Sequence, residues 1–65
     1  MLVDLNGETI ATQAATLHDL IEERGFDATS VATALNGQFV PRGMRAAVSL
    51  IDGAKIEVLS PMQGG

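Results

Sequence analysis

The alternation of apolar and polar positions predicts a β-hairpin at the start of the chain. Residues 1–5 form the first strand, with Val3 and Leu5 on one face, and residues 8–11 form the return strand. The Asn6-Gly7 pair between them is a strong hairpin signal, because both residues tolerate the positive φ that a two-residue turn requires. We therefore expect two antiparallel strands in the first eleven residues.

A helix is predicted next, at residues 17–24. Leu17, Leu20 and Ile21 have the i, i+3, i+4 spacing that places three side chains on one helical face. Thr16 precedes them and is suited to cap the first turn, and Gly25 provides the left-handed conformation with which helices commonly end. The acidic side chains of the helix are expected to be solvated: Asp19, Glu22 and Glu23.

Two further turn signals divide the rest of the chain. A second hairpin is predicted at residues 31–40, with Asn36-Gly37 as its turn. Residues 43–47 are expected to form one helical turn. The Asp52-Gly53 pair then leads into a final strand at residues 55–59.

This order of elements, in a chain of 65 residues, leaves room for one sheet and one helix. The economical closure places the last strand in the middle of a mixed sheet, parallel to the first strand. That arrangement is the α+β architecture called β-grasp, which ubiquitin-like proteins have. We expect residues 1–59 to form this single domain and residues 60–65, which show no periodicity, to form a flexible tail ending in Gly-Gly.

The expected core consists of apolar residues from every element: Val3, Leu5, Ile10, Leu17, Leu20, Ile21, Val31, Leu35, Ile56 and Val58. A sheet covered by one helix leaves its other face bare. The residues left without an obvious place in the core are Ala32, Ala34, Leu59 and either Phe39 or Val40. Either a partner covers them, or they are the scattered apolar residues that any small protein exposes.

Composition excludes several kinds of protein. Eight acidic residues against four scattered basic ones do not supply the clustered charge that neutralises phosphates, so nucleic acid is not an expected partner. The chain has no cysteine, and its one histidine, His18, cannot supply a metal site. The apolar runs are too short to cross a membrane, and the acidic N-terminal segment does not resemble a signal peptide. The expected compartment is the cytoplasm.

No catalytic constellation is recognisable in the sequence. His18, Asp19 and Glu22 lie in the predicted helix and are better explained as a charged surface than as an acid-base cluster. The glycines form isolated turn pairs instead of a phosphate-binding loop between a strand and a helix. We therefore do not expect the chain to be an enzyme.

The C-terminal sequence SPMQGG is the remaining candidate for chemistry. Its six residues can reach about 20 Å when extended, and two terminal glycines can enter a narrow channel. The carboxylate of Gly65 is ionised at neutral pH and can attack the α-phosphate of ATP. A sulfur donor can convert the resulting acyl-adenylate to a thiocarboxylate. A frayed terminus explains the same residues equally well.

Four segments that span the chain carry a family resemblance: DLNGET, TLHDLIEERG, VATALNGQFVPR and IDGAKIEVLSPMQGG. Together with the chain length, they resemble the ThiS family, the sulfur-carrier proteins of thiamine biosynthesis. The most specific parts are ALNGQFVPR and SPMQGG. One departure is Ala54, where relatives often place an acidic or polar residue after Asp-Gly, and we expect this change to alter a surface contact without affecting the tail.

The resemblance implies a β-grasp carrier protein that is a co-substrate of other enzymes. It implies that a ThiF-type enzyme uses ATP to adenylate Gly65, that a sulfur donor converts this residue to 1-thioglycine, and that thiazole synthase (ThiG) receives the sulfur. The chain itself binds no cofactor in this scheme. The residues implied to enter the partner active sites are Met62, Gln63, Gly64 and Gly65. Docking through the bare sheet face, at Phe39 and Leu59, is our own hypothesis.

Two other interpretations stay open. The small subunit of molybdopterin synthase shares the fold, the Gly-Gly end and an adenylating partner, although such chains are typically longer and differ before the glycines. The chain could also be a ubiquitin-like modifier, whose terminal glycine is joined to lysines of target proteins, or a noncovalent binding domain.

Overall fold

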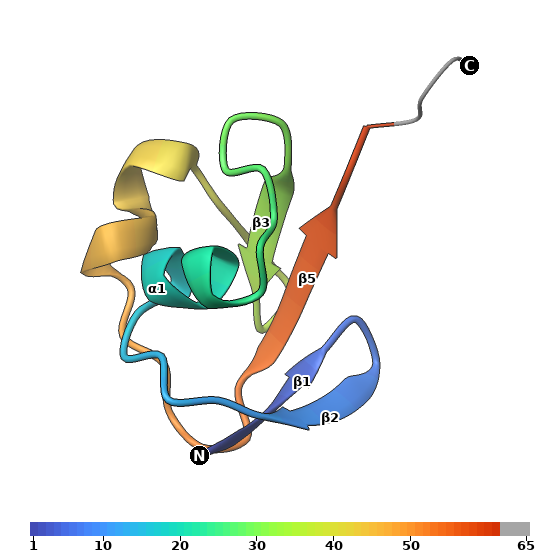
Figure 1. Ribbon diagram of the computed structural model, residues 1–65, viewed down its shortest axis with the longest axis vertical. Helices are drawn as coiled ribbons and strands as arrows, with labels where there is room; N and C mark the ends of the chain where they lie inside the picture. Colours follow the sequence, from blue (N-terminus) through green and yellow to red (C-terminus); the bar gives the residue numbers. More distant parts are fainter. Residues whose placement is uncertain (62–65) are drawn as a thin grey trace.

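A computed structural model of the chain describes residues 1–61. Five strands in this part form one mixed sheet with the order β2-β1-β5-β3-β4. One α-helix and one 3₁₀ helix accompany the sheet (Figure 1). In chain order the elements are β1 (Leu2–Leu5), β2 (Glu8–Ala11), α1 (Leu17–Glu23), β3 (Ala32–Leu35), β4 (Gln38–Val40), η1 (Arg42–Ala47) and β5 (Lys55–Leu59).

The last strand lies at the centre of the sheet, between the two hairpins (Figure 1). β5 pairs with β1 in parallel, with Asp4 opposite Lys55 and Leu5 opposite Ile56. It pairs with β3 in the antiparallel direction from Ile56 to Leu59. The predicted β-grasp topology is thereby confirmed.

Both hairpins turn at the Asn-Gly pairs. Asn6 and Asn36 have positive φ angles of 53° and 51°. Gly7 and Gly37 follow with φ of 85° and 84°. Two successive positive φ angles are characteristic of the two-residue turn whose twist matches that of the flanking strands, which explains why this dipeptide recurs at both positions.

Helix α1 begins and ends where the sequence predicts, within one residue. The Thr16 hydroxyl accepts a hydrogen bond from the Asp19 backbone N–H (3.1 Å), which satisfies one of the free donors of the first turn. Leu17, Leu20 and Ile21 are fully buried on the face toward the sheet. The acidic side chains of Asp19, Glu22 and Glu23 are exposed, as predicted, but the Glu23 carboxylate also accepts hydrogen bonds from the chain after β2.

Glu23 joins the end of α1 to the segment after β2. Its carboxylate accepts hydrogen bonds from the Thr12 hydroxyl (2.6 Å) and the Gln13 backbone N–H (3.2 Å). Thr12 is buried, and its hydroxyl oxygen also accepts from the Ala14 N–H. This network fixes the irregular connection that leads from the first hairpin into the helix.

The core confirms most of the predicted residues and adds others. Ile10 and Leu35 are only partly buried and pack against the core. The apolar residues that are buried although the sequence did not predict it are Ala14, Val40, Leu50 and Ala54. The expectation that the change at Ala54 alters a surface contact is wrong, because Ala54 is 3% exposed. Its backbone carbonyl accepts a hydrogen bond from the N–H of Asp4 in β1. An acidic side chain would be buried there at a cost.

The predicted turn at residues 43–47 is a 3₁₀ helix, η1, that contacts α1. None of the helices in residues 1–61 is long and apolar enough to cross a membrane.

Replacing Leu20 by Ala is expected to lower the free energy of unfolding by about 2–5 kcal/mol, because the side chain is fully buried and leaves a cavity. Glu22→Ala is the matched control: Glu22 lies two residues further along the same helix, on its exposed face, and the change is expected to alter stability by less than about 0.5 kcal/mol. Urea denaturation measures both. Equal stability of the two variants would show that Leu20 does not face the core.

Candidate functional site

The central strand carries the chain toward its C-terminus. β5 ends at Leu59, and Ser60 and Pro61 follow within the described residues. The candidate residues Met62, Gln63, Gly64 and Gly65 lie outside the part of the chain that the structure describes. The two candidate docking residues, Phe39 and Leu59, lie inside it and can be placed.

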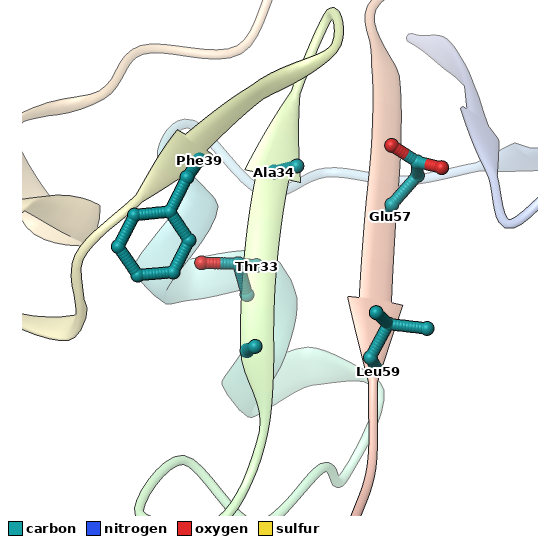
Figure 2. A pocket seen from close by; sticks show the side chains of 6 residues that line it. Thr33, Ala34, Phe39, Glu57 and Leu59 are labelled. Atoms are coloured by element: carbon teal, nitrogen blue, oxygen red, sulfur yellow. The ribbon is translucent and has the colours of Figure 1, made fainter.

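Phe39 and Leu59 lie on the face of the sheet that points away from α1. They are 69% and 70% exposed. Figure 2 shows Phe39 on β4 and Leu59 on β5, on either side of β3, with Ala34 on β3 and Glu57 on β5. The sequence left open whether Phe39 or Val40 would be exposed, and the structure buries Val40.

The strand registers make this surface continuous. Ala34 lies opposite Phe39 on one side and opposite Glu57 on the other, and Ala32 lies opposite Leu59. Directly opposed side chains of antiparallel strands are about 5 Å apart, so a contiguous patch extends across three strands. We call this patch the docking surface; the residues that line its pocket are Ala32, Thr33, Ala34, Phe39, Glu57 and Leu59.

The hollow in the docking surface follows from side-chain size. β3 presents only the methyl groups of Ala32 and Ala34, whereas the neighbouring strands present the larger side chains of Phe39 and Leu59. The lining is almost entirely apolar, and Glu57 adds one carboxylate. Such a surface suits an apolar side chain of a partner with a basic group nearby.

A buried arginine supports the docking surface from the opposite side of the sheet. Arg45 of η1 is 2% exposed, and its Nε donates to the Thr33 hydroxyl (3.0 Å). Its Nη1 and Nη2 donate to the carbonyls of Ala28 (2.9 Å) and Val31 (2.7 Å). The Thr33 hydroxyl in turn donates to the Val40 carbonyl (2.8 Å). The guanidinium thus joins η1 to β3, and the Thr33 hydroxyl extends the network to β4.

The loop that supplies these carbonyls is itself held by Asp27. Its carboxylate accepts from the Thr29 hydroxyl (2.7 Å) and backbone N–H (3.0 Å), and from the Ser30 hydroxyl (2.8 Å). The hydrogen bond from the Thr29 hydroxyl is the main reason that the pKa of Asp27 is lowered, because it stabilises the ionised carboxylate. The turn is therefore held in the form that presents carbonyl oxygens to Arg45.

The other titratable candidates are not gathered into a site. His18, Asp19 and Glu22 are exposed on α1. Within residues 1–61 no group of three or more His, Cys, Asp or Glu side chains could hold a metal ion.

A family model decides the relationship of the chain to known proteins. The model of the ThiS family matches residues 2–65. The chain belongs to the ThiS family. The match includes the Gly-Gly end, so it covers both the folded part described above and the candidate residues beyond it.

Two solved structures are similar to this ThiS-family chain. The crystal structure of the thiamine biosynthesis protein ThiS from Geobacter metallireducens is 28% identical, with a TM-score of 0.84, and the comparison covers 100% of both chains. An NMR solution structure of a thiamine biosynthesis protein from Geobacter metallireducens is 28% identical, with a TM-score of 0.83, over 100% of this chain and 88% of that one. No curated protein sequence gave a significant match.

In this member of the ThiS family, the burial of Arg45 beneath the docking surface is the feature that the sequence did not reveal. The residue is one of four basic residues that look scattered along the chain. Arginine is seldom fully buried, and the three oxygens that accept from Arg45 lie 12 to 17 residues away. No local pattern signals such a contact.

Arg45→Met is expected to lower the free energy of unfolding by roughly 2–4 kcal/mol, because Met fills similar space but removes the donors to the buried Val31 carbonyl and the partly buried Ala28 carbonyl. Arg42→Met, an exposed arginine of the same 3₁₀ helix, is the control and is expected to be nearly neutral. Chemical denaturation of both variants provides the comparison. If they unfold at the same denaturant concentration, the Arg45 network does not stabilise the fold.

Proposed function

We propose that this chain is a sulfur carrier of thiamine biosynthesis that serves partner enzymes as a co-substrate and does not catalyse. The observation that carries the proposal is the match of the ThiS family model over residues 2–65, through the terminal Gly-Gly. The likeness to a ThiS structure over the full length of both chains supports it.

The reactive group in this proposal is the carboxylate of Gly65. One of its oxygens attacks the α-phosphate of ATP and displaces pyrophosphate, which gives an acyl-adenylate. A sulfur nucleophile then attacks the carbonyl carbon and displaces AMP, which leaves 1-thioglycine at the end of the chain. The carboxylate is a weak nucleophile, and activation makes its carbonyl reactive. Because activation consumes ATP, the cytoplasm is the expected compartment.

Two partners follow from this scheme. A ThiF-type adenylating enzyme binds ATP and activates Gly65, and thiazole synthase (ThiG) receives the sulfur from the thiocarboxylate. Gly64, Gln63 and Met62 form the tail that enters both active sites. The narrow, side-chain-free end that two glycines provide suits a channel leading to a buried phosphate.

The docking surface is the proposed contact with these partners. Complete burial of an aromatic or leucine side chain contributes about 1.5–3 kcal/mol, so Phe39 and Leu59 together can support a complex of moderate strength. Moderate affinity suits a carrier, because it must leave the activating enzyme before it can serve the next one.

Intact-mass measurement with fragmentation tests the proposal. The protein is incubated with ATP, an active ThiF-type enzyme and a sulfur source, and an ATP-dependent shift confined to Gly65 is expected. Fragmentation is needed because oxidation of Met1, Met44 or Met62 nearly equals the exchange of one oxygen for sulfur. The absence of a mass shift, with a ThiF-type enzyme that is shown to activate the carrier protein it normally serves, would overturn the proposal. An isopeptide-linked product would indicate a protein modifier.

Addition of one residue after Gly65 is expected to abolish activation. The added residue moves the carboxylate by about 3.5 Å and places a new group beside it, so the carboxylate no longer reaches the α-phosphate. Within residues 1–61, none of the strands and helices extends beyond Leu59, so the melting temperature should stay unchanged and serves as the control. Normal ATP-dependent activation of the extended chain would contradict the assigned role of Gly65.

Phe39→Ser and Leu59→Ser are each expected to raise the KM for activation about tenfold while kcat changes little, because they remove apolar area that is buried only in the complex. Ile51→Ser is the matched control: Ile51 is 67% exposed but lies outside the docking surface. Steady-state pyrophosphate release gives both constants. Equal KM values for all three variants would show that the partner binds elsewhere.

A further inference from the structure

The central strand is flanked unequally by its neighbours. On one side β3 is paired with β5 from Ile56 to Leu59. On the other side β1 is paired with β5 only at Lys55 and Ile56, because the chain turns away at Asn6-Gly7. The last part of β5, which leads to the C-terminus, therefore lacks a backbone partner on the β1 side.

The Asn6 side chain occupies this position. The Asn6 backbone N–H donates to the Ile56 carbonyl (2.9 Å), and this is the next hydrogen bond of the parallel ladder after the one from the Asp4 N–H to the Ala54 carbonyl. Its side-chain Oδ1 accepts from the Val58 N–H (2.8 Å), and its Nδ2 donates to the Val58 carbonyl (3.2 Å). A carboxamide offers the same donor and acceptor as a peptide group, so it continues the parallel ladder by one more residue.

Asn36 makes a related contact at the other end of the same strand. Its backbone N–H donates to the Lys55 carbonyl (2.7 Å), and its Oδ1 accepts from the Lys55 N–H (3.0 Å). The two Asn-Gly turns thus hold β5 from opposite sides. Asn36 binds Lys55, the first residue of β5, and Asn6 binds Val58, the residue before the last. Either asparagine could be exchanged for glycine without strain from the positive φ.

We propose that the Asn6 carboxamide is a positioning group for the C-terminal tail. It holds Val58 in the sheet, and with it Leu59, which lies both in the docking surface and at the point where the tail begins. This inference rests on the proposed function, because it assigns Asn6 to the presentation of Gly65. Without the carboxamide the end of β5 frays, and the partner must order it again during binding.

Asn6→Gly and Asn36→Gly are matched variants for the test. Both remove a carboxamide from the same type of turn, and both keep the backbone bond of residue 6 or 36 to β5. Hydrogen exchange of the intact protein is expected to increase about tenfold at the Val58 amide in Asn6→Gly, and at the Lys55 amide in Asn36→Gly. The other amide should change little in each variant. Equal exchange at Val58 in the two variants would overturn the proposal.

Activation kinetics then distinguish a positioning role from a purely structural one. Asn6→Gly is expected to raise the KM for activation by a ThiF-type enzyme about three- to tenfold, with kcat within twofold, whereas Asn36→Gly should change neither. An unchanged KM despite faster Val58 exchange would also overturn the positioning role. If the native chain is not activated at all, the proposed function fails, while exchange at Val58 still decides whether Asn6 holds the end of β5.

Discussion

The parallel pairing of β5 with β1 is the constraint on which the rest of the structure depends. Only two residue pairs join these two strands: Asp4 with Lys55 and Leu5 with Ile56. All intervening elements must therefore fold outside this pairing, with α1 on one face and the second hairpin along the other edge of β5 (Figure 1). Because α1 covers only one face of the sheet, the other face is left bare. The same topology makes β5, from which the chain continues to its C-terminus, the central strand.

The second hairpin is held to this frame by polar contacts as well as by apolar packing. Arg45 is a buried cation whose hydrogen bonds go to neutral oxygens, and removal of a charge from water is costly. The cost is offset where every buried group finds a partner, and no buried side-chain polar atom in residues 1–61 lacks one. The contact joins η1 to β3 directly, and to β4 through the Thr33 hydroxyl.

Local patterns were sufficient to predict the elements, because each element carries its own signal. The topology was a separate inference, from the economical closure of one sheet on one helix, and the observed strand order confirms it. The Asn-Gly pairs marked both turns, Thr16 marked the start of α1, and strand alternation marked Ile56 and Val58. The choice between Phe39 and Val40 had no local answer, since a strand of three residues shows no clear alternation. The register of Val40 with buried Thr33 decides it. The burial of Arg45 and Ala54 likewise depends on residues distant in the sequence.

In the proposed function, the position of Leu59 links partner docking to delivery of the C-terminal residues. This residue lies in the docking surface, and Gly65 is the sixth residue after it. At 3.3 to 3.6 Å per residue, the terminal carboxylate can be at most about 20 Å from Leu59. Any enzyme that binds this surface must therefore have its reacting phosphate within that distance of its apolar contact. The fold thus restricts which enzymes can use the carrier by geometry as well as by affinity, and different partners can share one surface only if they share this spacing.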